Sequence, residues 1–194
     1  RSQIWTVPAD GSREPAPLTT APQSSNGPRW SPDGRAIAFL SARAAPGDAN
    51  GDAPRTQVWL LPLSGGEPRR VTTLANGAAG FQWSPDGTKL LVFTNSRQVW
   101  RSNTRGDYWV LDRDSGRLTR IGGDAPASTL MYAKFSPSGD RVAYVRSGDI
   151  YVQRLADGAI TRLTTGASAT LVNGMTDWVY EEEFGLRDGF RWSP

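Results

Sequence analysis

Short apolar runs of four or five residues alternate with polar turns rich in glycine and proline along most of this chain. Each run has the length of a β-strand, and no helical pattern of 10–15 residues alternates with the runs. A parallel α/β fold needs such helices between its strands, so the pattern argues against that class. The chain is therefore predicted to be all-β, with hairpins and short turns.

The pattern recurs at a nearly constant interval. An aromatic residue followed by Ser-Pro stands at Trp30, Trp83, Phe135 and Trp192, so the steps between repeats are 53, 52 and 57 residues. In the first two copies Ser-Pro continues into Asp-Gly, a turn in which proline presets φ and glycine accepts a positive φ. A fixed period of this length indicates a solenoid or a propeller.

Each repeat supplies four short strands joined by glycine and proline turns, which is the pattern of a propeller blade. The first strand of each repeat ends at the aromatic residue. The strands that follow are expected at 36–40, 57–61 and 69–72, at 89–93, 107–111 and 118–121, and at 141–145, 149–152 and 160–163. Residues 3–7 and 16–19 match the third and fourth strands of a preceding blade.

We predict one partial β-propeller domain over residues 1–194, with three complete blades and partial blades at both ends. Its divisions are a partial blade at 1–26, blades at 27–78, 79–130 and 131–168, and a glutamate-bearing insertion with the first strand of the next blade at 169–194. Propellers have about 4–8 blades. These residues are therefore expected to be a fragment, or the ordered part, of a larger propeller.

The composition excludes several kinds of site. There are 22 basic and 19 acidic residues with no run of Lys or Arg, so no nucleic-acid surface is expected, and no apolar run approaches the ~20 residues of a membrane span. Cysteine and histidine are absent, so the chain holds no disulfide, no His or Cys metal site and no Ser-His-Asp triad. By itself it should be inactive, and no cofactor or metal is expected. Residues 48–52 alternate oxygen-bearing side chains but lack the glutamate of a calcium loop, and predict a flexible loop.

Three consecutive glutamates, Glu181, Glu182 and Glu183, stand among aromatic and branched residues in 177–184. We expect packing of these neighbours to hold at least some of the carboxylates in place. Two unit charges ~4 Å apart repel by about 4 kcal/mol at an effective dielectric near 20, so a held acidic pair is a suitable receptor for an ammonium group. The alternative is the acidic first turn of a short helix, where carboxylates interact favourably with the helix dipole.

Residues 93–109, 130–137 and 176–184 resemble the N-terminal propeller of the dipeptidyl peptidase IV family. The most specific element is Trp-Val-Tyr-Glu-Glu-Glu at 178–183, and the resemblance covers roughly 88–194. The family comprises serine exopeptidases of the prolyl oligopeptidase clan, which release N-terminal dipeptides with proline or alanine second. In these enzymes the propeller caps an α/β-hydrolase domain.

The resemblance implies roles for individual residues. Glu182 and Glu183 match the glutamate pair that grips the free α-ammonium group of the substrate, and Arg101 matches an arginine that contacts a substrate carbonyl. Glu181 matches a neighbour without an assigned role. An arginine beside the acids lowers their mutual repulsion and donates to carbonyl oxygens. Without the matching neighbours, Arg101 would be read as an ordinary surface arginine.

The first half of the chain has a different character. Residues 2–11, 28–34 and 58–66 resemble blades of acylaminoacyl-peptidase-like enzymes of the same clan and of TolB-type propellers. The change falls near 83–87, a turn that both groups share. Two explanations stay open: a divergent peptidase, or a recombined or engineered propeller joined at this turn.

Three functions follow as hypotheses. The first is a substrate-recognition propeller of a dipeptidyl peptidase IV-like serine exopeptidase, which binds a peptide with a free N-terminus and works with an α/β-hydrolase domain outside these residues. For that enzyme the resemblance implies a homodimer as one assembly, and a periplasmic or secreted location with the cytoplasm as the alternative. The second is a non-catalytic binding propeller, TolB-like or engineered, whose rim contacts another protein. The third is a structural fold without a ligand.

Overall fold

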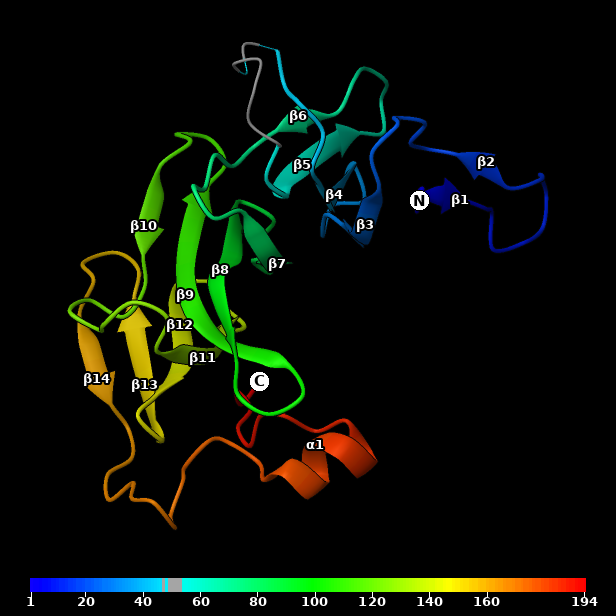
Figure 1. Ribbon diagram of the computed structural model, residues 1–194. Coiled ribbons are helices and arrows are strands. Elements are labelled where there is room, and N and C mark those ends of the chain that lie inside the picture. Colours follow the sequence, from blue (N-terminus) through cyan, green and yellow to red (C-terminus); the bar gives the residue numbers. More distant parts are fainter. Residues whose placement is uncertain (47, 49–53) are drawn as a thin grey trace. The chain divides into compact units, whose positions relative to one another are not determined.

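Apart from one short helix, the regular elements of this chain are β-strands in antiparallel sheets, as the hydrophobic pattern predicts (Figure 1). The computed structural model describes residues 1–46, 48 and 54–194, so residues 49–52 of the predicted loop at 48–52 lie outside the described residues. The chain divides into two units, Arg1–Gly80 and Phe81–Pro194, each with its own core. Over the described residues, no helix is both long and apolar enough to cross a membrane.

The first unit contains a two-stranded and a four-stranded sheet, each with its strands in chain order. Their strands are β1 (Trp5–Thr6) and β2 (Ala16–Pro17), then β3 (Ser25–Trp30), β4 (Ala36–Ser41), β5 (Gln57–Pro62) and β6 (Arg69–Arg70). They fall where the repeat predicts strands. The core of this unit gathers Ile4, Phe39, Trp59 and Leu61, so residues before β1 pack with residues of the larger sheet.

The second unit is built around one sheet of eight strands. Its strands are β7 (Ala78–Trp83, across the unit boundary), β8 (Lys89–Gln98), β9 (Asn103–Asp112), β10 (Leu118–Arg120), β11 (Leu130–Phe135), β12 (Arg141–Arg146), β13 (Asp149–Arg154) and β14 (Ile160–Arg162). Two successive repeats, β7–β10 and β11–β14, share this sheet because β9 also pairs with β11. In that pairing Leu130 lies opposite Gly106, and Met131 lies opposite Arg105.

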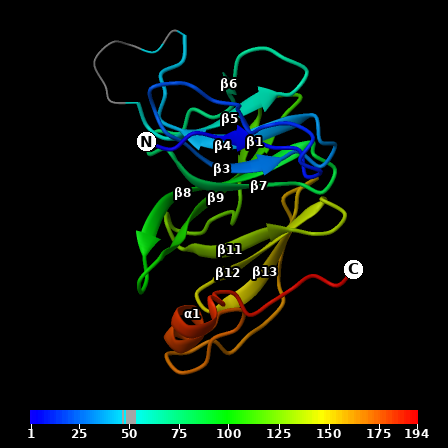
Figure 2. The same cartoon turned by 90° about the vertical axis from the view of Figure 1, so that its right-hand side faces the viewer.

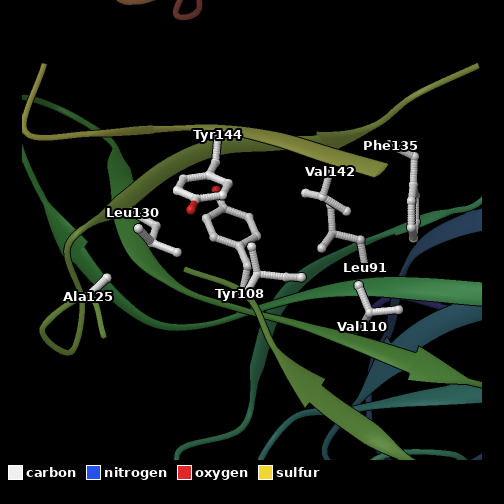
Figure 3. Packing of buried hydrophobic residues seen from close by; sticks show 9 residues of the cluster. Leu91, Tyr108, Val110, Ala125, Leu130, Phe135, Val142 and Tyr144 are labelled. Atoms are coloured by element: carbon white, nitrogen blue, oxygen red, sulfur yellow. The ribbon is translucent and has the colours of Figure 1, made fainter. Parts of the chain in front are cut away.

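The core of the second unit draws side chains from both repeats. Leu91 of β8 and Val110 of β9 belong to the same cluster as Leu130 of β11 and Val142 and Tyr144 of β12 (Figure 3). Each fully buried side chain of this kind stabilises the fold by about 1.5–3 kcal/mol. The packing therefore supports the β9–β11 pairing and fixes one repeat against the next.

The Ser-Pro-Asp-Gly turns form as expected. In the second copy the Ser84 hydroxyl donates to Asp86 Oδ1 at 2.6 Å, and Gly87 takes a φ of 71°. The same hydroxyl accepts the N–H of Lys89 at 2.8 Å, which ties the turn to the start of β8. Burial acts to raise the pKa of Asp86, but the hydrogen bonds from Ser84 and Thr88 outweigh it and lower the pKa to about 2.

Strands β8 and β9 are longer than predicted. The pattern predicts strands at 89–93 and 107–111, but β8 continues to Gln98 and β9 begins at Asn103. We call residues 94–106 the β8–β9 arm. Hydrophobic periodicity marks only strands that bury one face in a core, and most of the arm between Asn95 and Arg105 is polar.

The strand predicted within 189–194 is not formed. These residues contain no strand, and the only bridge near them joins Asp188 to Met175 among the described residues. Trp192 instead donates its Nε1–H to the Lys134 carbonyl at 3.4 Å. In the preceding repeat the first strand pairs with the second strand that follows it, as β11 does with β12. Residues 189–194 have no such partner in the part of the chain that the structure describes.

Candidate functional site

Arg101 lies at the tip of the β8–β9 arm. The tip is a turn in which the Val99 N–H donates to the Ser102 carbonyl at 3.1 Å, and Gln98 Nε2 donates to the Trp100 carbonyl at 2.7 Å. In Figures 1 and 2 the arm extends from the sheet toward α1 (Trp178–Phe184), the helix that carries the three glutamates. The hairpin thus brings a residue of one repeat toward a segment that follows the next repeat.

Local sequence explains why α1 forms at this place. Asp177 is the N-cap, and its carboxylate accepts the N–H of Tyr180 at 3.1 Å. Gly185 ends the helix in the left-handed conformation with a φ of 64°. Aspartate before a helix and glycine after it are favourable caps. The alternative interpretation of 177–184 as a short helix with Glu181 in its acidic first turn is therefore correct for the secondary structure.

The expectation that the aromatic neighbours pack around the acids is wrong. Trp178, Tyr180 and Phe184 are exposed, and Glu181 is the only buried residue of α1. Residues four apart share a helix face, and the rings of Tyr180 and Phe184 lie together with centroids 5.7 Å apart. The two rings therefore contact each other, and the ion pairs of the carboxylates are with arginines outside the helix, Arg101 and Arg187.

Glu182 and Arg101 meet directly. Arg101 Nε lies 2.7 Å from Glu182 Oε1, although about eighty residues separate the two positions in the chain. The Glu182 side chain is 22% exposed and that of Arg101 is 78% exposed. An ion pair with one partner this exposed contributes about 0–1 kcal/mol to stability. The guanidinium group can therefore exchange this contact for another at little cost.

Glu181 is the buried member of the three, at 7% exposure. Its Oε1 lies 3.7 Å from Arg187 Nε, and neither carboxylate oxygen has a hydrogen-bond partner over the described part of the chain. The contact with Arg187 is thus electrostatic and longer than a hydrogen bond. A buried carboxylate without hydrogen bonds is costly, so Arg187 is its principal compensation.

Glu183 completes the cluster. It is exposed, and no ion pair reaches it within the described ranges. Three carboxylates therefore face two guanidinium groups, those of Arg101 and Arg187, which leaves one negative charge in excess. A single cation such as an ammonium group matches that excess.

The return leg of this segment is anchored on β11. Lys134 donates to the Asp188 carboxylate and, at 3.0 Å, to the Phe190 carbonyl, and its Nζ lies 4.0 Å from the centre of the Phe190 ring. Burial acts to raise the pKa of Asp188, but the hydrogen bond and the charge of Lys134, with a further contribution from Arg191, hold it below its ordinary value. Arg187, through Glu181, and Asp188, through Lys134, therefore help to fix the glutamate helix.

Tyr132 lies in a strained position beside this cluster. It occupies the bulge of β11 between Met131 and Lys134 with a φ of 56°, where the equivalent residue of the first repeat is Gly27 with a φ of 59°. A bulky residue at positive φ is an outlier. Burial raises the pKa of Tyr132, and the charge of Glu181 adds to this effect. Strain of this kind concentrates at functional sites.

The structure brings together two of the three residues predicted from the sequence, Arg101 and Glu182, and presents Glu183 on the same helix. The contributions of Lys134 and Arg187 were missed. No sequence signal points to Lys134, because a single lysine in a strand is usually a solvated residue. Asp177 and Gly185 could have been recognised as caps from their spacing around 178–184.

Comparisons with known proteins identify the family of this chain. A family model described as "Dipeptidyl peptidase IV (DPP IV) N-terminal region" matches residues 84–194. A probable dipeptidyl-aminopeptidase B of Neosartorya fischeri is 35% identical over 109 residues, and one of Talaromyces marneffei is 31% identical over 135 residues. These alignments cover 56% and 69% of this chain. The chain spans only 12% and 15% of the length of the two relatives.

Solved structures show the same fold. Dipeptidyl peptidase 4 of Porphyromonas gingivalis superposes with a TM-score of 0.65 at 23% identity, covering 84% of this chain and 22% of that one. A putative TolB of Agrobacterium tumefaciens superposes with a TM-score of 0.57 at 24% identity, covering 86% of this chain and 56% of that one. The likenesses to the dipeptidyl peptidase IV propeller and to TolB-type propellers, which the sequence indicates, are confirmed. The fold is a partial β-propeller. The chain belongs to the family of the dipeptidyl peptidase IV N-terminal region.

Proposed function

We propose that this chain is the substrate-recognition propeller of a dipeptidyl peptidase IV-like serine exopeptidase that releases N-terminal Xaa-Pro and Xaa-Ala dipeptides. One observation carries the proposal: Arg101, from the arm of one repeat, lies 2.7 Å from Glu182 on α1, with Glu183 beside it. The names of the fungal relatives support the same activity.

In this proposal the glutamates bind the free α-ammonium group of a peptide. Glu183 has no competing ion pair among the described residues, so it offers the first contact for the ammonium group. Glu182 provides the second acceptor once Arg101 turns toward the substrate carbonyl. Charge-assisted hydrogen bonds of this type are about twice as strong as neutral ones.

The anchor also explains how cleavage is limited to dipeptides. Carboxylates that hold the N-terminus fix the distance from that terminus to the scissile bond, so two residues fit between them. The nucleophile, base and acid of the hydrolysis would come from an α/β-hydrolase domain outside this chain, which contains no histidine. The role of this chain is therefore recognition, and its partner is a peptide with a free N-terminus.

The test uses the full-length protein that carries this chain and a Gly-Pro reporter substrate. Glu182→Gln and Glu183→Gln each remove one charge while keeping the shape, and should lower kcat/KM by at least about tenfold, since a hydrogen bond to a charged group is worth ~1.5–3 kcal/mol. Glu14→Gln, an exposed glutamate of the first unit, is the matched control. Unchanged kcat/KM in both site variants would refute the proposal.

A further inference from the structure

One polar position recurs in each repeat two residues before an aromatic residue of the third strand. It is followed by a branched or aromatic residue and then by Trp or Tyr, and its four occupants are Gln3, Gln57, Asp107 and Asp149. The first unit has glutamine at this position and the second unit has aspartate. The two repeats of the second unit are also those from which Arg101 and the glutamate helix extend.

The glutamines bond within their own repeat. Gln57 Oε1 accepts from the Thr72 hydroxyl at 2.8 Å and from the Leu74 N–H at 3.0 Å, and Gln57 Nε2 donates to the Leu74 carbonyl at 2.8 Å. Gln3 repeats this with the Thr19 hydroxyl at 2.7 Å and the Ala21 carbonyl at 2.7 Å. An amide both donates and accepts, so each glutamine can bond to the backbone that follows the fourth strand of its own repeat.

Asp107 contacts Arg120 of β10 at 3.4 Å within its blade, and it also bonds to the base of the β8–β9 arm. It is 3% exposed, and its Oδ2 accepts from Asn95 Nδ2 at 2.7 Å while its Oδ1 accepts from the Ser128 N–H at 2.9 Å. The Ser128 hydroxyl in turn donates to the Asn95 carbonyl at 2.8 Å. Asn95 has a φ of 50°, in the irregular part of β8 where the arm departs from the blade.

Asp149 makes the corresponding contact with the glutamate segment. It is 1% exposed and accepts from Asn173 Nδ2 at 2.8 Å, from the Thr164 hydroxyl at 2.9 Å and from Arg162. Asn173 lies four residues before Asp177, the N-cap of α1, on the leg that leads into the helix. An aspartate only accepts, and in both repeats an asparagine of the functional extension is one of its donors.

We propose that Asp107 and Asp149 are positioning residues for the ammonium site, each anchoring through an asparagine the base of one of the two extensions that present Arg101 and Glu182. The inference rests on the proposed function and adds the residues that set the geometry of its site. Glutamine at the same position, as at Gln57, holds only its own blade.

The central experiment reverses one donor–acceptor pair in the full-length protein. Asn95→Asp keeps the shape but sets a second carboxylate against that of Asp107, and neither carboxylate can donate a hydrogen bond. The double variant with Asp107→Asn restores one donor and one acceptor between positions 95 and 107. Aspartate tolerates the positive φ of position 95. We expect Asn95→Asp to raise KM for a Gly-Pro reporter by about tenfold or more, and the double variant to recover most of the loss.

Two controls separate positioning from general destabilisation. Gln57→Ala removes the equivalent bonds in a repeat that carries neither Arg101 nor the glutamate helix, so it should leave KM unchanged. Turnover of a p-nitrophenyl ester without an ammonium group should be unchanged in every variant. Amide hydrogen exchange should rise over 96–105 in Asn95→Asp and over 174–188 in Asn173→Asp, and neither variant should affect the other segment.

The outcomes separate the two proposals. If Glu182→Gln raises KM while Asn95→Asp changes neither KM nor exchange in the arm, the positioning role is overturned and the proposed function stands. A double variant without recovery, or a Gln57→Ala variant equal to Asn95→Asp, also overturns it. If Glu182→Gln leaves KM unchanged, the proposed function is refuted, but this result does not refute the anchoring of the two extensions. The exchange pattern then decides whether the aspartates anchor the two extensions.

Discussion

Glu181 differs from its two neighbours in environment although all three are the same residue type. Its side chain is buried against Arg187, whereas Glu183 is exposed and Glu182 pairs with the exposed Arg101. One turn of helix thus produces three different carboxylates. The residue type alone carries no information about which of them is available to a ligand.

This asymmetry predicts unequal effects for the two partners of the buried pair. Glu181→Gln removes a buried charge that has no hydrogen bond, so it should change the free energy of unfolding by less than about 1 kcal/mol, or stabilise the protein. Arg187→Ala leaves that charge buried without compensation and should cost about 1–3 kcal/mol. Urea unfolding of both variants at neutral pH is the measurement. A larger loss for Glu181→Gln than for Arg187→Ala would contradict this account.

The pair of Lys134 and Asp188 predicts a dependence on pH. Burial acts to raise the pKa of Asp188, but the hydrogen bonds and charges of Lys134 and Arg191 together outweigh it, so the pKa is lower in the folded protein than its ordinary value. Its stabilisation is therefore complete above the ordinary aspartate pKa of about 3.9 and is lost as the pH falls through the folded pKa. The free energy of unfolding of the wild type should exceed that of Asp188→Asn by ~1.5–3 kcal/mol at pH 7. This difference should shrink toward pH 3. A difference independent of pH would exclude this role.

At the scale of elements, the β8–β9 arm is the part of its blade that contributes to the candidate site, because it carries Arg101. It depends on a close approach at Gly106, where a Cβ would lie 2.4 Å from a ring carbon of Phe93 and 2.6 Å from the Thr94 carbonyl oxygen. The second contact is with backbone, which cannot move independently of the strand. Glycine is thus required here by packing, and its φ is not in the left-handed region.

Gly106→Ala should therefore destabilise the protein by roughly 3 kcal/mol, the upper end of the usual cost of overpacking. Gly116→Ala is a suitable comparison, because its Cβ meets open space and only the φ of 70° is unfavourable, for roughly 1 kcal/mol. Thermal unfolding of both variants gives the values. Equal losses would show that β9 accommodates a side chain at position 106.

Elements with one buried face were predictable and the extensions were not. Strands β4, β5 and β12 begin at the predicted residues and end within one residue of the expected position. The arm has no apolar stripe, since its polar residues are ordered by pairing with each other and with β11 rather than by burial. The strand expected within 189–194 has the right residues but no partner strand among the described residues.

At the scale of the whole molecule, this chain covers a small part of its relatives, 12% of the length of the N. fischeri protein. Helix α1 exposes Trp178, Tyr180 and Phe184 next to the carboxylates. In the proposed function, Glu183, which has no ion pair among the described residues, is the carboxylate left for the ligand.

The proposed function predicts how recognition depends on the ligand and on salt. In the full-length protein, a Gly-Pro peptide with a free N-terminus should compete with a reporter substrate, and its N-acetylated form should compete at least about tenfold less well because it lacks the charge. Competition by the free peptide should weaken between 0.05 and 0.5 M salt, roughly, as screening shortens the Debye length. Equal competition by both peptides would remove the ammonium site from the mechanism.

The sequence by itself determined the repeat, the blade strands and the candidate residues Arg101, Glu182 and Glu183, because strand periodicity, Ser-Pro-Asp-Gly turns and the glutamate element are local patterns. Only the tertiary structure decided that Arg101 reaches Glu182, that Glu181 is buried against Arg187, and that Asp107 and Asp149 bond to Asn95 and Asn173. The first of these contacts joins residues about eighty positions apart in the chain. Its geometry depends on how one repeat pairs with the next, and no local pattern contains that information.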